Sequence, residues 1–207
     1  MLRLVSTAGD PPVLEVADGP GLALPGLTLR PLARGETAPL MRVFRGLSAR
    51  SRYLRFLTGI PELRPDLLTR LADVDHDRHG CWVVSFAGEP VAIGRYIRSR
   101  EDPHTADVAL EVVDACQGVG LGRLTVQVLA AAAADAGVTT LSFLADETNT
   151  AVRRLTAAFP GARLTVEYGV LSGSAPIPDL PRVDAAQVAH VARWAREAAV
   201  LRAEEAA

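Results

Sequence analysis

The sequence predicts an α/β or α+β domain with a mixed β-sheet, and three observations support this class. Hydrophobic residues make up 49% of the 207 residues, which is enough for a sizeable core in one domain. Strand-like runs cluster first and then alternate with helix-like runs, as expected when helices pack onto a mixed sheet. No internal repeat interrupts this order. We therefore expect one globular domain with short appendages.

The first half of the chain is expected to form an arm followed by strands and helices in turn. Residues 1–26 are rich in proline and glycine and predict a loose arm or an edge hairpin. A strand is expected at 27–33. Apolar side chains then recur every three or four residues, which predicts helices at 35–48 and 61–74. Two apolar runs around a Gly-containing turn predict a β-hairpin at 81–97.

The second half alternates more regularly between strands and helices. It predicts a strand at 106–113, a helix at 122–137, a buried strand at 138–146, a helix at 148–162 and a final strand at 163–173. An alanine-rich amphipathic helix is expected further on. These elements place an N-terminal arm or edge hairpin at 1–26, the main domain at 27–175 and a C-terminal helical extension at 176–207.

The composition excludes several classes of function. The net charge of -2 and a pI near 6.1 provide no overall basic field, so we expect no nucleic-acid partner. No apolar run is long enough to cross a membrane, and Cys81 and Cys116 fit neither a metal site nor a disulfide framework. All 22 basic residues are arginine, which excludes chemistry that needs a lysine, such as a Schiff base. We expect a cytoplasmic protein without a bound metal.

The stretch Gln117–Arg123, QGVGLGR, lies between a predicted strand and a predicted helix. A glycine-rich turn at this place exposes backbone N–H groups at a helix N-terminus, where phosphate groups bind. The spacing is G-x-G-x-G, which matches neither the G-x-G-x-x-G dinucleotide fingerprint nor a P-loop. A phosphate-bearing cofactor is therefore expected here, and a simple tight turn is the alternative.

Two carboxylates share one face of the preceding strand. Because side chains alternate along a strand, Asp107 and Glu111 point to the same side, about 13 Å apart at 3.3 Å per residue. Such a spacing is too long for a dyad but suits groups placed along an open cleft. Either carboxylate is a candidate general base. The alternatives are that each lies on a solvated strand face or pairs with an arginine.

The glycine run also supports a family assignment. The spacing of Gln117, Gly120 and Gly122 resembles the [RQ]-x-x-G-x-[GA] signature of the GCN5-related N-acetyltransferases (GNAT superfamily), and Asn149 is similar to the asparagine that begins the next helix in that family. The stretch from Leu27 to Tyr168 resembles the bacterial protein-lysine acetyltransferases of the Pat type. This resemblance implies the acyl-CoA N-acyltransferase (GNAT) fold, with a mixed, mostly antiparallel sheet flanked by helices and an extra C-terminal helix.

The resemblance also implies a cofactor and a reaction. The co-substrate would be acetyl-CoA, bound by Val112, Val113, Gln117, Gly118, Val119, Gly120, Leu121, Gly122, Arg123, Asn149 and Arg153. The acetyl group would pass to a primary amine, a lysine side chain of another protein, by direct attack. A small amine such as a polyamine, amino acid or aminoglycoside is the alternative acceptor, and a non-catalytic acyl-CoA-binding module is the alternative function. We expect a monomer or a homodimer.

The resemblance assigns catalytic roles with two departures from the family pattern. Asp107 stands where the Pat-type proteins carry a glutamate taken as the general base, so its side chain is one methylene shorter, and Glu111 is the reserve candidate. Thr156 stands where many members carry a tyrosine as general acid, and threonine is a poor acid. The oxyanion donor would be a backbone amide of this strand, that of Leu110 or of Glu111.

Other polar and apolar features have structural interpretations. Cys116 is expected to be a small buried hydrophobe, and 73–80 a polar loop in which His76 borders the acceptor cleft. The resemblance places the arginine-rich stretch at 50–56 in a loop between the first two helices, next to the acceptor site. An apolar stripe on the C-terminal helix is expected to pack on the domain itself or on a second subunit; it consists of Val188, Val191, Trp194 and Leu201.

Overall fold

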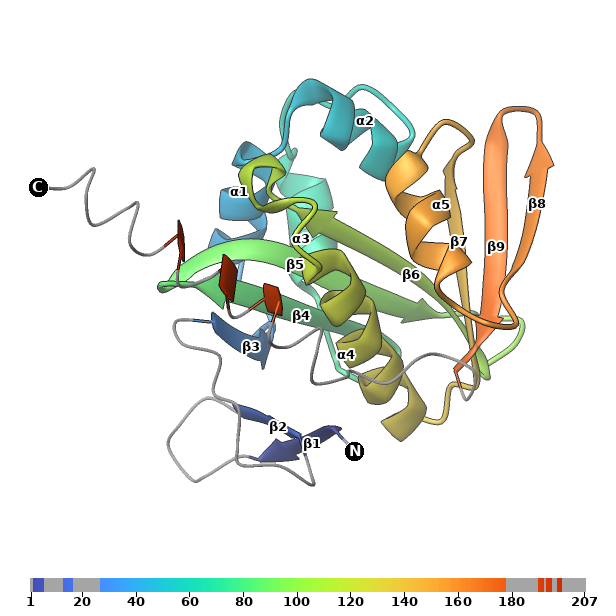
Figure 1. Ribbon diagram of the computed structural model, residues 1–207, viewed down its shortest axis with the longest axis horizontal. Helices are drawn as coiled ribbons and strands as arrows, with labels where there is room; N and C mark the ends of the chain where they lie inside the picture. Colours follow the sequence, from blue (N-terminus) through green and yellow to red (C-terminus); the bar gives the residue numbers. More distant parts are fainter. Residues whose placement is uncertain are drawn as a thin grey trace, which may run out of the picture.

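The protein is built around a seven-stranded mixed sheet with the strand order β3-β4-β5-β6-β7-β9-β8 (Figure 1). The computed structural model describes residues 2–5, 13–16, 27–177 and six positions of the C-terminal segment, namely 190, 191, 193, 194, 197 and 198. The strands of the sheet are β3 (Leu27–Pro31), β4 (His79–Phe86), β5 (Glu89–Arg98), β6 (Thr105–Val112), β7 (Thr140–Asp146), β8 (Arg163–Glu167) and β9 (Val170–Pro176). All neighbouring strands are antiparallel except β6 and β7, which are parallel.

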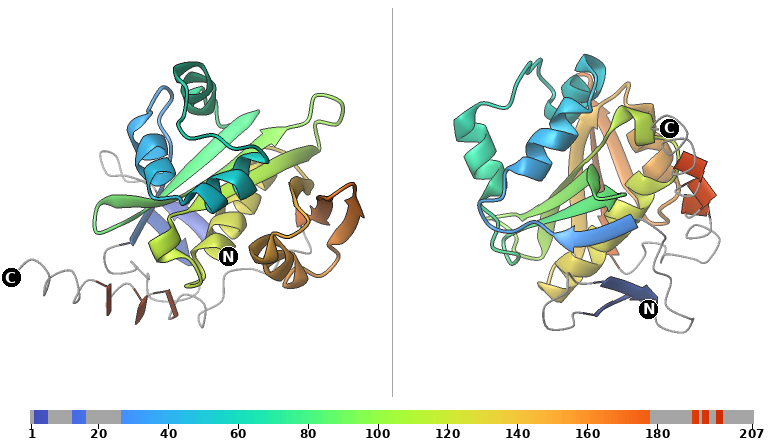
Figure 2. Two further views of the ribbon diagram at one scale, coloured as in Figure 1. Left: turned by 90° about the horizontal axis from the view of Figure 1, so that it is seen from above. Right: turned by 90° about the vertical axis from the view of Figure 1, so that its left-hand side faces the viewer.

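Helices cover both faces of this sheet, and Figure 2 shows α1–α3 and α4 on opposite sides of it. The helices are α1 (Ala38–Arg45), α2 (Ala49–Phe56), α3 (Pro65–Ala72), α4 (Leu121–Asp135) and α5 (Thr150–Ala157), with a short 3-10 turn, η1 (Asp114–Cys116). A separate antiparallel hairpin pairs β1 (Leu2–Val5) with β2 (Val13–Val16). The described part of the chain contains no helix that is long and apolar enough to span a membrane.

The core lies on both sides of the central strands. Helix α4 is buried along much of its length and packs on β5, where the missing side chain of Gly94 lets Thr125 and Leu129 approach. On the opposite face, Leu40 and Val43 of α1 pack with residues of β4 and β5. The alternation predicted for β6 is confirmed, because Glu111 lies opposite Ile93 and belongs to the α1–α3 face.

The sheet opens between β6 and β7. These two strands pair at only three positions, of which Asp107 with Ser142 is the last, although both strands continue beyond it. Figure 1 shows them diverging toward the end of the sheet at which α2 lies. We call the region in which these strands run on unpaired with each other, from Asp107 to the ends of both strands, the wedge.

Most predicted elements are confirmed, but three differ in an informative way. Residues 49–56, expected as a loop, form helix α2, which Ser48 caps by accepting a hydrogen bond from the amide of Ser51. The single final strand expected at 163–173 is a hairpin, because Tyr168 and Gly169 both have positive φ and reverse the chain. Strand β7 is buried on one face only, and Leu144 on the other face is 67% exposed.

The C-terminal helix lies mostly outside the described residues, including Val188 and Leu201. Two members of the expected stripe are described and do pack on the domain itself. Val191 is buried, and the ring centroid of Trp194 lies 5.0 Å from that of Phe86. Cys116 is buried in the same core, as expected.

Candidate active site

The glycine loop before α4 presents free backbone donors. Gly118 and Gly120 have φ angles of 79° and 90°, a conformation that side-chain-bearing residues rarely adopt. Gly120 is the N-cap of α4 and makes no side-chain capping bond. Within the described part of the chain, the amides of Gly118, Val119 and Gly120 donate to no other residue. Together with the N-terminus of a 15-residue helix, these amides form a site that suits a phosphate group.

The side chain of Gln117 stabilises this loop through hydrogen bonds. Its side-chain nitrogen donates to the carbonyl of Val112 at 3.0 Å and to Asp114 at 3.1 Å, and it lies 3.5 Å from the hydroxyl of Ser51. The side chain therefore fixes the turn between β6 and α4 and also contacts α2. Backbone groups, and not the Gln117 amide, are left to meet a ligand.

The other predicted cofactor residues of this segment are spread between core and surface. Leu121 is fully buried, and Val112 and Val119 pack against the same core. Val113 donates its amide to Val91 at 2.9 Å. The Nε atom of Arg123 is buried without a hydrogen-bond partner among the described residues, which leaves this guanidinium with donor capacity beside the loop.

Asn149 and Arg153 lie at the start of α5, beyond the other strand of the wedge. The Asn149 side-chain oxygen accepts a hydrogen bond from the amide of Val152 at 3.1 Å and so caps the helix, which leaves its NH2 group available as a donor. Arg153 donates to the carbonyl of Glu147 at 2.8 Å and is exposed. Both residues therefore lie at the turn that follows β7, and their predicted contact with the co-substrate stays a prediction.

Asp107 lies at the narrow end of the wedge. It is exposed, and its carboxylate accepts a hydrogen bond from the hydroxyl of Ser142, its partner on β7. Ile97 lies opposite it on β5 and is 48% exposed. A carboxylate in this position combines access to solvent with a fixed orientation, as a general base requires.

Glu111 has a different environment on the same strand face. It accepts a hydrogen bond from the Nε atom of Arg55 at 2.8 Å, and the two side chains are only 5% and 15% exposed. This matches the arginine-partner alternative left open by the sequence. The structure does not bring Glu111 and Asp107 together, because Ala109 lies between them on the same face of β6.

The hydroxyl group of Thr156 donates a hydrogen bond within helix α5. Its hydroxyl donates to the carbonyl of Val152 at 2.9 Å and lies 3.2 Å from that of Arg153. It is also buried. The geometry agrees with the expectation that this threonine is a poor general acid.

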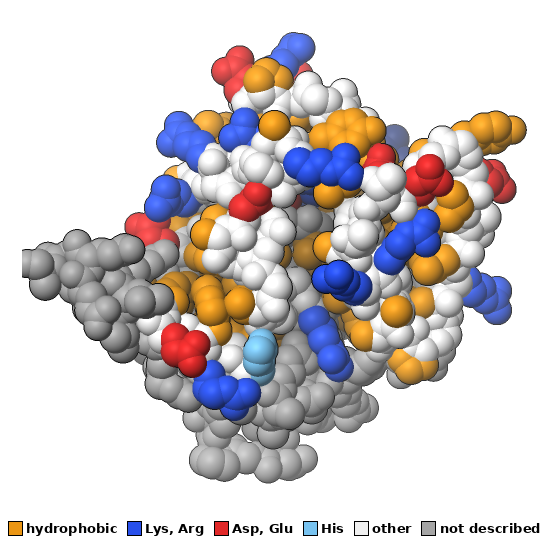
Figure 3. All heavy atoms as spheres, turned by 45° about the horizontal axis from the view of Figure 1, so that its top comes forward, with side chains coloured by type: hydrophobic (Ala, Val, Ile, Leu, Met, Phe, Trp, Pro, Cys, Tyr) orange, Lys and Arg blue, Asp and Glu red, His pale blue; other side chains and the backbone are white. Residues whose placement is uncertain are grey.

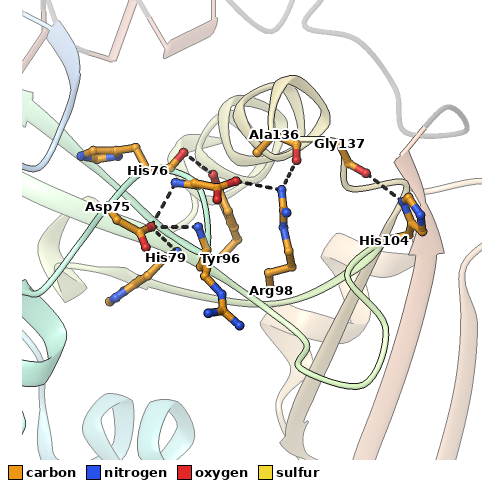
Figure 4. A network of polar contacts seen from close by, with 10 residues as sticks. Asp75, His76, His79, Tyr96, Arg98, His104, Ala136 and Gly137 are labelled. Carbon is orange, nitrogen blue, oxygen red and sulfur yellow. Dashed lines mark hydrogen bonds and ion pairs between the residues drawn. The ribbon is translucent and has the colours of Figure 1, made fainter.

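The polar loop that contains His76 is fastened to the sheet by several hydrogen bonds (Figure 4). Asp75 accepts hydrogen bonds from three consecutive backbone amides, and these bonds lower the pKa of its carboxyl. The ring of His76 contacts the carbonyl of Leu32 at 2.9 Å. Arg98 bonds the carbonyl of Ala136 at the C-terminus of α4, where a cation is favoured. The network therefore joins the loop to the sheet and to α4.

Sequence reasoning missed three residues that contact the predicted site. Arg55 pairs with Glu111 and Ser142 with Asp107, and both contacts depend on pairing between distant segments that spacing along the chain does not reveal. Val191 lies beside the glycine loop, since a methyl group added at Gly120 would stand 3.4 Å from it. The apolar stripe of the C-terminal helix was the available signal for Val191. For Arg55, the signal was the arginine-rich stretch at 50–56, which was expected next to the acceptor site. No comparable signal existed for Ser142.

These features define a class of protein. A parallel pair of strands that separates beside a glycine loop with free amides, followed by a capped helix, suits a long phosphate-bearing ligand that enters between the strands. The carboxylate at the narrow end suits proton abstraction. No cluster of potential metal ligands occurs among the described residues. Fold and site are those of an acyl-CoA-dependent acyltransferase.

The comparisons with known proteins agree with this class. Residues 48–159 match the model of the Acetyltransferase (GNAT) family. The chain therefore belongs to this family, is an acetyltransferase and uses acetyl-CoA. The free amides of the glycine loop fit the phosphate groups of this co-substrate.

Solved structures share the fold. The GNAT domain of PAT from S. lividans superposes with a TM-score of 0.67 and 23% identity, over 72% of this chain and 90% of that one. The protein yncA from Salmonella typhimurium, solved with its cofactor acetyl-CoA, gives 0.57 and 17%, over 77% and 99%. A cAMP-binding acyltransferase from Mycobacterium smegmatis gives 0.52 and 23%, over 82% of this chain and 50% of that one. The chain thus spans half of the last protein.

Proposed function

We propose that this protein transfers the acetyl group of acetyl-CoA to a lysine side chain of another protein, with Asp107 as the general base. The observation that carries the proposal is the position of Asp107, an exposed and oriented carboxylate where β6 and β7 begin to separate. We place the reaction in the cytoplasm, a compartment that agrees with the low cysteine content.

Groups beside both strands of the wedge would take part in the proposed reaction. The glycine-loop amides and the α4 N-terminus would hold the pyrophosphate, and the Asn149 NH2 group would meet the ligand from the opposite side. Acetyl-CoA supplies a thioester, whose C–S bond breaks as the new N–C bond forms. Asp107 would take the proton from the attacking amine, directly or through a water molecule, and the proton would end on the released thiolate. Because a thiol has an ordinary pKa of about 8.5, its thiolate is a good leaving group. No general acid is therefore needed.

The surface around Asp107 suits an acceptor that is part of a large molecule. Ile97, Leu144 and Val170 are exposed on the same face of the sheet, and Tyr53 of α2 lies nearby through its bond to Asp146. Figure 3 shows hydrophobic side chains interspersed with both signs of charge over this end of the molecule. An open apolar rim favours the aliphatic stem of a lysine side chain.

The test is release of free CoA when acetyl-CoA is supplied with lysine-bearing peptides, polyamines, amino acids or aminoglycosides. The proposal requires peptide turnover that exceeds turnover of the small amines. Because the chain contains no lysine, acetyl-lysine found in the mixture must come from the acceptor. Turnover of a small amine alone would show a different acceptor, and acetyl-CoA binding without any turnover would favour the non-catalytic module.

Asp107→Ala tests the base itself. We expect kcat to fall by about 100-fold or more, as for loss of a general base, while acetyl-CoA binding measured by calorimetry is retained. Asp107→Glu, which has the side chain carried by the Pat-type proteins, is the conservative partner and should keep activity. Full activity in Asp107→Ala would move the base elsewhere.

A further inference from the structure

Helix α2 lies across the wedge but is held there by polar contacts. It is the one described helix without a buried residue. Tyr53 donates to Asp146 of β7 at 3.3 Å, and Arg55 donates to Glu111 of β6 at 2.8 Å. One helix therefore bonds to both strands that bound the wedge.

The Arg55–Glu111 pair is the buried member of this set. Its side chains are 15% and 5% exposed, whereas those of Arg42 and Glu89, which form a pair of similar length, are 60% and 49% exposed. Removing one partner of a buried ion pair leaves an uncompensated charge, which costs far more than breaking an exposed pair. The contact of α2 with β6 therefore depends on this pair.

A second buried arginine, Arg95, lies near the Arg55–Glu111 pair. Arg95 is 2% exposed, and two of its guanidinium nitrogens, Nε and Nη2, have no hydrogen-bond partner among the described residues. Burial lowers the pKa of the Arg55 guanidinium most, and the nearby Arg95 lowers it further, whereas Glu111 opposes both effects. Without Glu111, the Arg55 guanidinium would keep the repulsion from Arg95 and lose the carboxylate that opposes it, which would disfavour its buried position beside β6.

We propose that the Arg55–Glu111 pair positions α2 over the acceptor side of the wedge and that Glu111 is a positioning residue, not the base. The inference rests on the proposed transfer to an amine. The Glu111 side chain is 5% exposed and is already bonded to Arg55, so an incoming amine could reach its carboxylate only by displacing that bond. Asp107 forms no ion pair with any residue that the structure describes, and it is accessible at the narrow end of the wedge.

Two variants and one control separate positioning from catalysis. Glu111→Gln removes the charge, and the double variant Arg55→Met with Glu111→Leu replaces the ion pair by apolar side chains, which often restores packing. Arg42→Met breaks the exposed Arg42–Glu89 pair and is the control. The measurements are acceptor KM, kcat and its pH profile, the acetyl-CoA dissociation constant, and hydrogen exchange of the α2 amides, which needs no activity.

We expect Glu111→Gln to raise acceptor KM about tenfold and to speed exchange in α2. The kcat and the acetyl-CoA affinity of this variant should stay within about threefold of the parent values. The acidic limb of its kcat pH profile should be kept. In the double variant, hydrogen exchange in α2 should be slow again and acceptor KM should return most of the way to the parent value. Arg42→Met should change neither quantity.

Loss of kcat and of the acidic limb in both Glu111 variants would make Glu111 the base and overturn the inference. Unchanged exchange and acceptor KM in Glu111→Gln would overturn it as well. If the parent protein turns over no amine, the proposed function fails, while α2 exchange still decides whether the pair holds the helix.

Discussion

The two faces of the central sheet are built by different means. On one face, α4 buries nine residues and packs closely on β5. On the other face, α2 buries none, and the interior beneath α1–α3 contains ionisable groups, among them Arg95 and Glu111. The first face supports the glycine loop, which is the predicted co-substrate site, while the second borders the predicted acceptor site.

The difference has a functional reason. One co-substrate must always be held in the same way, and apolar packing of a long helix fixes the loop at its N-terminus. Acceptors differ in shape, and a helix held by a few polar bonds can adjust at low cost because little apolar area is lost. We therefore expect changes on the α4 face to affect stability and co-substrate binding, and changes on the α2 face to affect the acceptor or the pH response.

The largest effect is expected from Gly94→Ala on the α4 face. A methyl group at this position would stand 2.4 Å from Cγ2 of Thr125 and 2.7 Å from Cδ1 of Leu129, so helix and strand would have to separate. We expect a loss of about 1–3 kcal/mol in the free energy of unfolding, measured by urea denaturation. Gly59→Ala, where a methyl group meets nothing within 4 Å, is the control. Equal stability of the two variants would contradict close packing of α4.

The glycine loop offers a matched pair of substitutions. Gly120 has a φ of 90°, so alanine there is strained by about 1–2 kcal/mol, and we expect Gly120→Ala to weaken acetyl-CoA binding about tenfold in calorimetry. Gly122 lies in the helix, where a methyl group would stand 3.5 Å from Leu110 in ordinary contact. Gly122→Ala should therefore bind acetyl-CoA nearly as the parent does. Equal losses of acetyl-CoA affinity in the two variants would mean that the room taken by an added methyl group, and not the backbone conformation of Gly120, governs binding.

The same contrast explains how much could be predicted from sequence. Helix α4 and the glycine loop were predicted closely, because hydrophobic period and glycine spacing are local signals. Helix α2 was missed because half of its residues are arginine or serine and none of its residues is buried, so no clear apolar stripe marked it. The final hairpin was missed because its turn uses Tyr168 at positive φ, a conformation uncommon for a tyrosine.

Long-range contacts explain the rest of the site. Asp107 and Glu111 were found by alternation along one strand, but their partners Ser142 and Arg55 lie 35 and 56 residues away. Pairing across that distance is decided by the order of strands in the sheet. The environments that distinguish an accessible carboxylate from a buried ion pair therefore became visible only in the fold.

The smallest effect is expected from His79 on the α2 face. Burial lowers the pKa of its imidazole, and the Arg95 cation lowers it further, although its bond to the carbonyl of Asp73 and the nearby carboxylate of Asp75 oppose this shift. The Nε2 atom lies 3.1 Å from Nη1 of Arg95, a contact that only the neutral ring can accept. Folding therefore favours the neutral form, and this contribution to stability is present above the ordinary histidine pKa of about 6.5 and is lost as the pH falls below it.

His79→Gln keeps a hydrogen-bonding side chain but cannot titrate. The parent protein should lose more of its free energy of unfolding between pH 7.5 and pH 5.5 than this variant does, when both are compared by urea denaturation. Because the effect comes from one partly exposed ring, it should be smaller than that of Gly94→Ala. A steeper loss in His79→Gln than in the parent would mean that the imidazole is protonated in the folded protein. The interior of the α2 face would then carry a further positive charge beside Arg95.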